Sequence, residues 1–208
     1  GHSDTEVIVN AFAEWGVGKT ISQLVGMFAI AAWDKLEKTF YLIRDRVGIK
    51  PIYWGIVEGG RLIFGSELRA LRSSGICPTT ISRSAVASYL RFAYVPSPHS
   101  VYKGVCKLEP GCILTIKAGG PPVISRYWDA TSVAQTGKSN LINASESDIT
   151  DQLENLLSDA VKCRMVADVP LGAFLSGGVD SSLVVALMQK QSERPVQTYC
   201  IEFDVPEF

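Results

Sequence analysis

The chain has 208 residues, of which 47% are hydrophobic, and its 20 basic residues nearly balance 21 acidic ones for a formal net charge of -1. This length suits one large domain or two small ones. The balanced charge gives no electrostatic basis for binding nucleic acid or an anionic membrane, and no apolar run reaches the ~18 residues that span a bilayer.

The five cysteines are odd in number and include no CxxC pair. This pattern argues against a disulfide framework and against a zinc site. We therefore expect reduced, mostly buried thiols in a cytoplasmic protein. The chain begins at Gly1 without Met or a signal peptide and stops just after an apolar run, so we expect both ends to be cut within a longer protein.

The first part of the chain alternates between helical and strand-like patterns. A helix is expected to begin at Ser3 or Asp4 and to end at Gly16, with a short helix over residues 20–25. Two hairpins are expected to pair residues 27–33 with 39–43 and 52–57 with 61–64. The run 27–33 is continuously apolar, which predicts burial on both faces.

Further helices are expected over residues 67–72 and 84–92, and a strand over residues 112–116. Hairpins and helices without long crossovers favour an antiparallel sheet with helices packed on it, an α+β arrangement. Residues 131–147 are rich in Ser, Thr, Asn, Gln and Gly, so we place an interdomain linker at residues 129–147.

The pattern after the linker is different. It predicts an amphipathic helix over residues 148–165, a strand over 169–175, a helix over 181–191 and a β-rich run over 196–203. Strand, helix and strand at this spacing form a βαβ unit, which predicts the start of a parallel sheet and an α/β domain.

Between the predicted strand and helix lies Leu175-Ser176-Gly177-Gly178-Val179-Asp180-Ser181-Ser182. A helix N-terminus attracts anions, the glycines let the backbone approach a phosphate, and the serines add hydroxyl donors. A carboxylate beside phosphates repels them unless a cation intervenes, so Asp180 is a candidate Mg²⁺ ligand. The alternative is a plain Gly-Gly turn in which Asp180 or Ser181 caps the helix.

The motif Ser-Gly-Gly-Val-Asp-Ser-Ser resembles the pyrophosphate-binding signature of the ATP pyrophosphatases. The flanking motifs are similar to those of glutamine-dependent asparagine synthetases. They are Arg44-Asp45-Arg46-Val47-Gly48-Ile49-Lys50-Pro51-Ile52-Tyr53, Phe64-Gly65-Ser66-Glu67, Lys107-Leu108-Glu109-Pro110-Gly111 and Asp168-Val169-Pro170-Leu171-Gly172-Ala173-Phe174. The resemblance runs over nearly the whole chain.

This resemblance implies three segments. Residues 1–128 would be the C-terminal part of an Ntn-type αββα glutamine amidotransferase sandwich, and residues 129–147 the linker. Residues 148–208 would begin a parallel-sheet ATP-pyrophosphatase domain of the adenine nucleotide α-hydrolase-like type. The family's catalytic residue is an N-terminal cysteine, whereas this chain begins at Gly1 and has no cysteine before Cys77.

The resemblance also assigns roles. The expected ATP-binding residues are Leu175, Ser176, Gly177, Gly178, Asp180, Ser181, Ser182 and Ile201, with Asp180 holding Mg²⁺ against the pyrophosphate. Leu175 would back the adenosine and Ile201, in the following strand, would touch the adenine; ordinary strand core is the alternative for both. Asp4 would bind the α-amino group of glutamine, with a bare helix cap as its alternative.

The implied reaction uses ATP, L-aspartate and L-glutamine to form L-asparagine through β-aspartyl-AMP. The resemblance also allows a homodimer. Because neither the cysteine nor the aspartate pocket is present, we expect the chain on its own to be inactive. Two alternatives stay open: a related amidotransferase that acts on another carboxylate, and a truncated module without catalysis.

Two other clusters carry weaker signals. Gly18-Lys19-Thr20 resembles the end of a P-loop, but position 13, where that motif needs glycine, is Ala13. Arg44, Asp45 and Arg46, together with Lys50, form either a functional basic cluster or a group that stabilises a turn or a domain interface.

Overall fold

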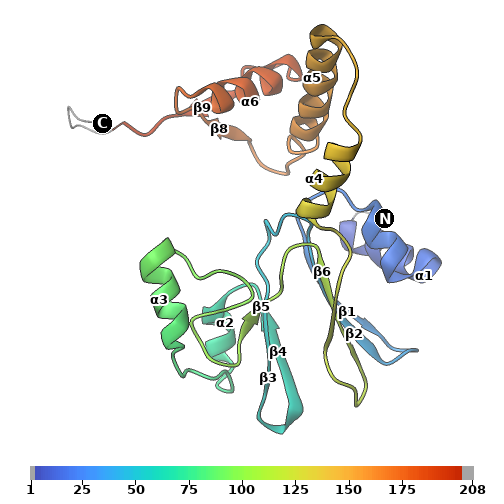
Figure 1. The fold of residues 1–208 in the computed structure, drawn as a ribbon, viewed down its shortest axis with the longest axis vertical. Helices are drawn as coiled ribbons and strands as arrows, with labels where there is room; N and C mark the ends of the chain where they lie inside the picture. The colour runs from blue at the N-terminus through green and yellow to red at the C-terminus, as the bar shows by residue number, and fades with distance from the viewer. Residues whose placement is uncertain (1–2, 203–208) are drawn as a thin grey trace. The chain divides into compact units, whose positions relative to one another are not determined.

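The computed structural model describes residues 3–202 (Figure 1), and the chain divides into two compact units, Gly1–Ser139 and Asn140–Phe208. The boundary lies within the segment expected to be the linker. No helix among residues 3–202 is both long and apolar enough to cross a membrane.

The first unit contains helices, strands and a short 3₁₀ turn. In chain order they are α1 (Asp4–Gln23), β1 (Ala29–Asp34), β2 (Thr39–Arg44), β3 (Tyr53–Val57), η1 (Glu58–Gly60), β4 (Arg61–Gly65), α2 (Leu68–Ser73), α3 (Arg83–Phe92), β5 (Cys106–Lys107), β6 (Cys112–Lys117), β7 (Val123–Arg126) and α4 (Ala130–Ser139).

The strands form two antiparallel sheets, in the order β1-β2-β6-β7 and β4-β3-β5. Both expected hairpins, β1 with β2 and β3 with β4, are confirmed, as are the helices α2 and α3. Strands β5 and β7 were not expected. They are short, and β7 is exposed throughout, so it shows no apolar alternation that the sequence could reveal.

Alternation along β2 and β6 divides the core between the two faces of the first sheet. Leu42 lies opposite Leu114, and both are buried in a cluster that also includes Trp54 of β3. The next pair, Ile43 opposite Ile113, packs on the other face against Ile21 of α1. Period-2 alternation therefore gives this sheet a helix on one face and the second sheet on the other.

The second sheet follows the same rule. Trp54 contributes to the cluster shared with the first sheet, whereas Val57 and Ile63 pack against Leu71 of α2. The layer order is helix, sheet, sheet, helix. The expected antiparallel sheet with helices packed on it is thus present, with a second sheet in addition.

The expectation that residues 27–33 are buried on both faces is wrong. Strand β1 alternates between partly buried and exposed positions, and Trp33 is 52% exposed. β1 lies at one edge of its sheet and pairs only with β2 in the part of the chain described. An apolar run alone does not distinguish such a strand from a central one.

Helix α1 is interrupted at Gly16, as expected, where φ is 77° and ψ is 164°. The buried hydroxyl of Thr20 lies 2.9 Å from the carbonyl oxygens of both Ala11 and Gly16, and can donate to either across the break. Thr20 is therefore part of the helix core, which agrees with rejecting the P-loop interpretation.

The Arg44 and Asp45 side chains organise the turn after β2. The Asp45 carboxylate, which is fully buried, accepts hydrogen bonds from the backbone N–H groups of Ile49 and Lys50 at 2.9 Å. Arg44 donates to the carbonyl oxygens of Gly48, Lys50 and Leu108 at 2.8, 3.0 and 2.6 Å. These two residues therefore stabilise a turn, the second of the two interpretations weighed for this cluster.

Tyr127 ties this turn to the end of the first sheet. Its hydroxyl donates to the Arg44 carbonyl oxygen at 2.7 Å, and its backbone N–H donates to the Gly111 carbonyl oxygen at 2.8 Å. Burial, followed by the Asp45 charge, raises the pKa of Tyr127 to about 12. Gly111 has a φ of 64°, and a Cβ there would lie 2.2 Å from the Trp128 carbonyl oxygen, so only glycine fits.

The segment expected to be a linker contains helix α4. The helix follows Asp129, whose carboxylate accepts hydrogen bonds from the Ser132 backbone N–H at 2.8 Å and from its hydroxyl at 2.9 Å. These bonds, the backbone one first, hold the pKa of Asp129 below its usual value. An aspartate cap thus starts a helix in a sequence whose polar composition suggested none.

The second unit is a βαβ unit preceded by a helix. Its elements are α5 (Glu146–Lys162), β8 (Gly172–Phe174), α6 (Val179–Lys190) and β9 (Gln197–Tyr199). Strands β8 and β9 are parallel, with Ala173 opposite Thr198, as expected. The Gln191 side-chain amide donates to the Ser158 hydroxyl at 3.1 Å, which joins the end of α6 to α5.

All five cysteines are free, as expected, but only Cys112 is buried, whereas Cys163 and Cys200 are exposed. The expectation of mostly buried thiols is therefore wrong. Both exposed cysteines lie in the second unit, at the end of α5 and just beyond β9, where the described residues provide little covering structure.

We predict that Asp45→Asn lowers the free energy of unfolding by about 2–3 kcal/mol, because a buried carboxylate with two backbone donors is replaced by a neutral amide. Asp34→Asn is the matched control. The Asp34 carboxylate also accepts from two backbone N–H groups, at 2.9 Å, but in an exposed turn. Urea denaturation should show a loss below about 1 kcal/mol for the control. Equal losses would contradict the role of burial.

We predict that Tyr127→Phe costs about 1 kcal/mol at neutral pH, because the hydroxyl no longer donates to Arg44. The folded-state pKa is raised, so the stabilisation is complete below the unfolded-state value near 10 and is lost as pH rises through about 12. Denaturation at pH 9 and 12 should show a smaller alkaline loss of stability for the variant. An unchanged alkaline loss would refute this assignment.

Candidate functional site

The glycine–serine loop connects β8 to α6. The Leu175 backbone N–H donates to the Tyr199 carbonyl oxygen at 2.8 Å, which extends the parallel ladder by one residue beyond β8. The Leu175 side chain is partly buried. The sheet therefore holds the start of the loop directly beside the end of β9.

The serine hydroxyls converge inside the loop. The Oγ atoms of Ser176 and Ser181 lie 3.1 Å apart, and the Ser181 hydroxyl also lies 3.1 Å from the Gly178 carbonyl oxygen, to which it donates. The Ser182 backbone N–H donates to the same carbonyl at 3.1 Å, as the first helical bond of α6. Ser176 and Ser181 are thus brought together across the mouth of the loop.

The N-terminus of α6 has no side-chain cap among the described residues. Gly178 occupies the cap position, so the alternative in which Asp180 or Ser181 is the cap is wrong. Both residues lie in the first turn of the helix instead. Without a cap, the first N–H groups of the helix have no side-chain acceptor, which leaves them able to donate to an anion.

The two glycines play different roles. Gly177 has a φ of 79°, a left-handed conformation that other residues adopt at a cost, and a Cβ built there meets no atom within 4 Å. Gly178 has an ordinary φ of -77°. A Cβ on Gly178 would lie 3.7 Å from the Ser176 hydroxyl oxygen and 4.0 Å from that of Ser181, so it would point into the loop.

Asp180 lies exposed in the first turn of α6, and its side chain makes no ion pair or hydrogen bond with another residue in the range 3–202. Its carboxylate is therefore open to a cation. No group of three or more His, Cys, Asp or Glu side chains suited to a metal occurs in that range. A cation at Asp180 would take its other ligands from water or from the bound anion, as Mg²⁺ does with phosphates.

Ile201 is not where the sequence placed it. Strand β9 ends at Tyr199, and Ile201 lies beyond it with 69% of its surface exposed. The pairing with β8 covers only three residues of each strand, so no ladder supports the chain as far as Ile201. Neither the expected strand position nor the alternative of ordinary strand core is correct for this residue.

Asp4 lies in the first unit, at the start of α1. Ser3 occupies the N-cap position, and its hydroxyl accepts from the Thr5 backbone N–H at 3.2 Å. The Asp4 carboxylate accepts from the same N–H at 2.8 Å and is exposed. Asp4 thus supports the helix start with one carboxylate oxygen, and its other oxygen has no partner among residues 3–202.

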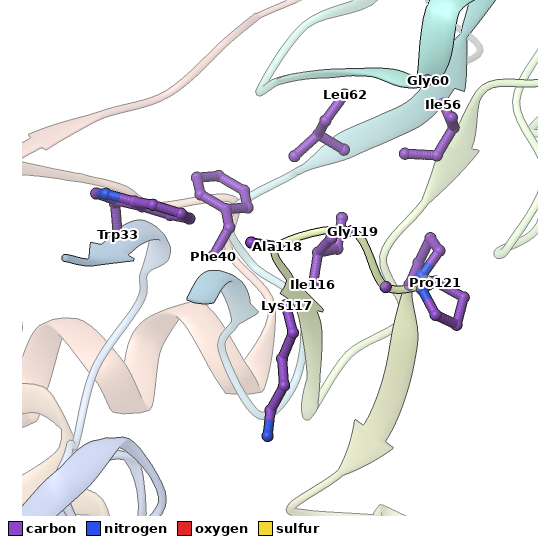
Figure 2. A pocket seen from close by; sticks show the side chains of 12 residues that line it. Trp33, Phe40, Ile56, Gly60, Leu62, Ile116, Lys117, Ala118, Gly119 and Pro121 are labelled. Carbon is purple, nitrogen blue, oxygen red and sulfur yellow. The ribbon is translucent and has the colours of Figure 1, made fainter. Parts of the chain in front are cut away.

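An apolar groove of about 620 Å³ opens between the two sheets of the first unit, and sequence analysis did not find it (Figure 2). Trp33, Phe40 and Ile56 line it, together with the turn after β6. Lys117 is its one ionisable lining residue, and in Figure 2 that side chain extends away from the other labelled side chains. Lys117 therefore has no second ionisable side chain in this groove with which to form an acid–base pair.

The three cysteines of the first unit are poorly suited to act as nucleophiles. Burial raises the pKa of Cys77, Cys106 and Cys112, which disfavours the reactive thiolate.

Comparison with protein families gives two matches. Residues 1–128 match the family described as a glutamine amidotransferase domain. Residues 152–208 match the family described as asparagine synthase. The two matched segments lie on either side of α4 and the chain that follows it.

The chain is also similar over most of its length to curated proteins. It is 31% identical over 207 residues to asparagine synthetase [glutamine-hydrolyzing] 3 of Bacillus subtilis, covering 97% of this chain and 32% of the relative. It is 34% identical over 207 residues to putative asparagine synthetase [glutamine-hydrolyzing] 2 of Methanocaldococcus jannaschii, covering 97% and 38%.

A relative with a different name is amidase chry2 of Gibberella zeae, which is 31% identical over 188 residues, covering 90% of this chain and 27% of the relative. The chain thus spans between 27% and 38% of the length of these three curated relatives.

The two loop glycines give a matched pair of variants. Gly177→Ala should lower the free energy of unfolding by about 1 kcal/mol, because alanine must adopt a left-handed conformation. Gly178→Ala should cost less, because its φ suits alanine and its Cβ makes ordinary contacts. Urea denaturation distinguishes the two, and a larger loss for Gly178→Ala would contradict the loop conformation.

Proposed function

Because the chain belongs to the glutamine amidotransferase family, matched over residues 1–128, and continues into an asparagine synthase segment, we propose that it forms part of a glutamine-hydrolysing asparagine synthetase. Residues 1–128 are assigned to an Ntn-type amidotransferase domain and residues 148–208 to an ATP-pyrophosphatase domain. Residues 129–147, which contain α4, connect the two.

The layer order of the first unit supports the first assignment. Helix α1, two antiparallel sheets and helix α2 follow one another as αββα, the arrangement of an Ntn-type sandwich. The parallel pair β8 and β9, joined by α6, supports the second assignment, because nucleotide-binding α/β domains place ligands at the carboxyl ends of parallel strands.

The observation that carries the ATP proposal is the uncapped N-terminus of α6 beside the converging Ser176 and Ser181 hydroxyls. Backbone N–H groups and hydroxyls are suitable donors for the phosphate oxygens of ATP. Asp180 would hold Mg²⁺, which would offset the repulsion between this carboxylate and the pyrophosphate. Leu175, Gly177, Gly178 and Ser182 complete the proposed ATP site.

In the proposed reaction, a side-chain carboxylate oxygen of L-aspartate attacks the α-phosphorus of ATP, and the bond to pyrophosphate breaks. Ammonia from L-glutamine then attacks the acyl carbon of β-aspartyl-AMP, and AMP leaves with the electron pair of its acyl bond. The loop donors stabilise the charge that develops on the departing pyrophosphate. Asp4 is proposed to pair with the α-amino group of L-glutamine.

A second candidate is a related amidotransferase that acts on another carboxylate. We keep this candidate because one relative, to which 90% of this chain aligns, is named as an amidase and not as an asparagine synthetase. The glycine–serine loop would bind ATP in the same way in both candidates, so the carboxylate that accepts the ammonia distinguishes them. In the complete protein, pyrophosphate release from ATP that depends on L-aspartate supports asparagine synthesis, and release that depends only on another carboxylate supports the second candidate.

The ATP site is tested by calorimetric titration of the chain with Mg·ATP. We expect Asp180→Ala to weaken binding about tenfold or more, equivalent to ~1.4 kcal/mol, because the cation loses its protein ligand. Asp151→Ala, which removes an exposed carboxylate from α5 in the same unit, is the control and should leave binding unchanged. Equal binding by both variants would place the site elsewhere.

A further inference from the structure

A small pocket of about 190 Å³ lies in the first unit beside the turn after β2. Two cationic side chains line it, Arg44 from the end of β2 and Lys107 from β5. Tyr53, Tyr94 and Ser97 contribute hydroxyl-bearing side chains. None of its lining residues is acidic. The pocket shares no lining residue with the apolar groove between the sheets.

Both cations are in a partly desolvated environment. Arg44 is only 9% exposed, and burial lowers its pKa. Burial also lowers the pKa of Lys107, and the charge of Arg44 lowers it further. Two like charges that disfavour each other across a small pocket are stabilised when an anion lies between them. The buried carboxylate of Asp45, the residue after Arg44, already accepts hydrogen bonds from two backbone N–H groups.

Hydrogen-bond donors remain after the internal contacts are counted. A guanidinium has five N–H groups, and Arg44 uses one on each nitrogen to bond the carbonyl oxygens of Gly48, Lys50 and Leu108. The Lys107 ammonium donates to the Val95 carbonyl oxygen and has three N–H groups in total. Both side chains are thus held in place by backbone carbonyls while further donors are left on the charged groups.

We propose that this pocket binds a small oxyanion, a carboxylate or phosphate group, between Arg44 and Lys107. Its volume suits a compact anion and is too small for a nucleotide, since ligand pockets for drug-sized molecules begin at about 300 Å³. The carbonyl oxygens that fix Arg44 belong to the turn after β2 and to Leu108. An anion bound here would therefore contact Arg44, the same side chain that connects this turn to Leu108. The site does not depend on the proposed ATP loop.

The test is a titration of the full chain with inorganic phosphate, at constant ionic strength, followed by calorimetry. We expect saturable binding that Lys107→Gln weakens tenfold or more and that Lys107→Arg largely restores. Lys103→Gln is the matched control, because Lys103 precedes β5, is exposed and does not line the pocket. Thermal melting confirms that each variant is folded.

Tyr94→Phe is the second variant, because it removes one pocket hydroxyl from an exposed residue without removing a charge. It should weaken phosphate binding while leaving the melting temperature unchanged. A parallel titration with L-glutamate distinguishes a carboxylate ligand from a phosphate. Failure of both anions to bind the folded chain, or equal binding by Lys107→Gln and Lys103→Gln, would overturn the proposal.

Discussion

The buried Arg44 and Asp45 side chains are the constraint on which the first unit depends. The chain passes from the first sheet to the second through residues 45–52, which belong to no strand. Asp45 accepts hydrogen bonds from two N–H groups of this turn, and Arg44 donates to two of its carbonyl groups and to Leu108, 64 residues further along. These two charged side chains can be buried because hydrogen bonds to backbone groups replace the hydrogen bonds that they would make to water.

The same turn sets the start of β6. The Gly111 backbone N–H donates to the Asp45 carbonyl oxygen, and Tyr127 bonds both Arg44 and Gly111. Three segments distant in sequence, residues 44–50, residues 108–111 and Tyr127, are therefore joined by hydrogen bonds around one buried pair. The apolar clusters on either face of the first sheet depend on that alignment, because a slip of one residue would exchange Leu42 with Ile43 and Leu114 with Ile113. Arg44 of this pair also lines the proposed anion pocket.

Sequence patterns were sufficient where local rules decide the structure. Both hairpins, the break at Gly16 and the βαβ unit follow from alternation, glycine conformation and turn composition. The serine loop was located correctly between β8 and α6. Sequence patterns were insufficient where the structure depends on a specific pairing or cap. Strand β7 forms because it pairs with β6, and helix α4 begins where the Asp129 side chain caps it. Ile201 was misplaced because strand length depends on the neighbouring strand.

Residues 176–182 are proposed to hold the pyrophosphate of Mg·ATP, and backbone amide chemical shifts of the chain test this role most directly. Addition of Mg·ATP should shift the amide signals of Gly177 to Ser182 most strongly, because the N–H groups at the start of α6 would donate to phosphate oxygens. The Asp34 turn and the rest of the first unit should change little. Shifts concentrated outside this loop, or no shifts at saturating Mg·ATP, would contradict the account.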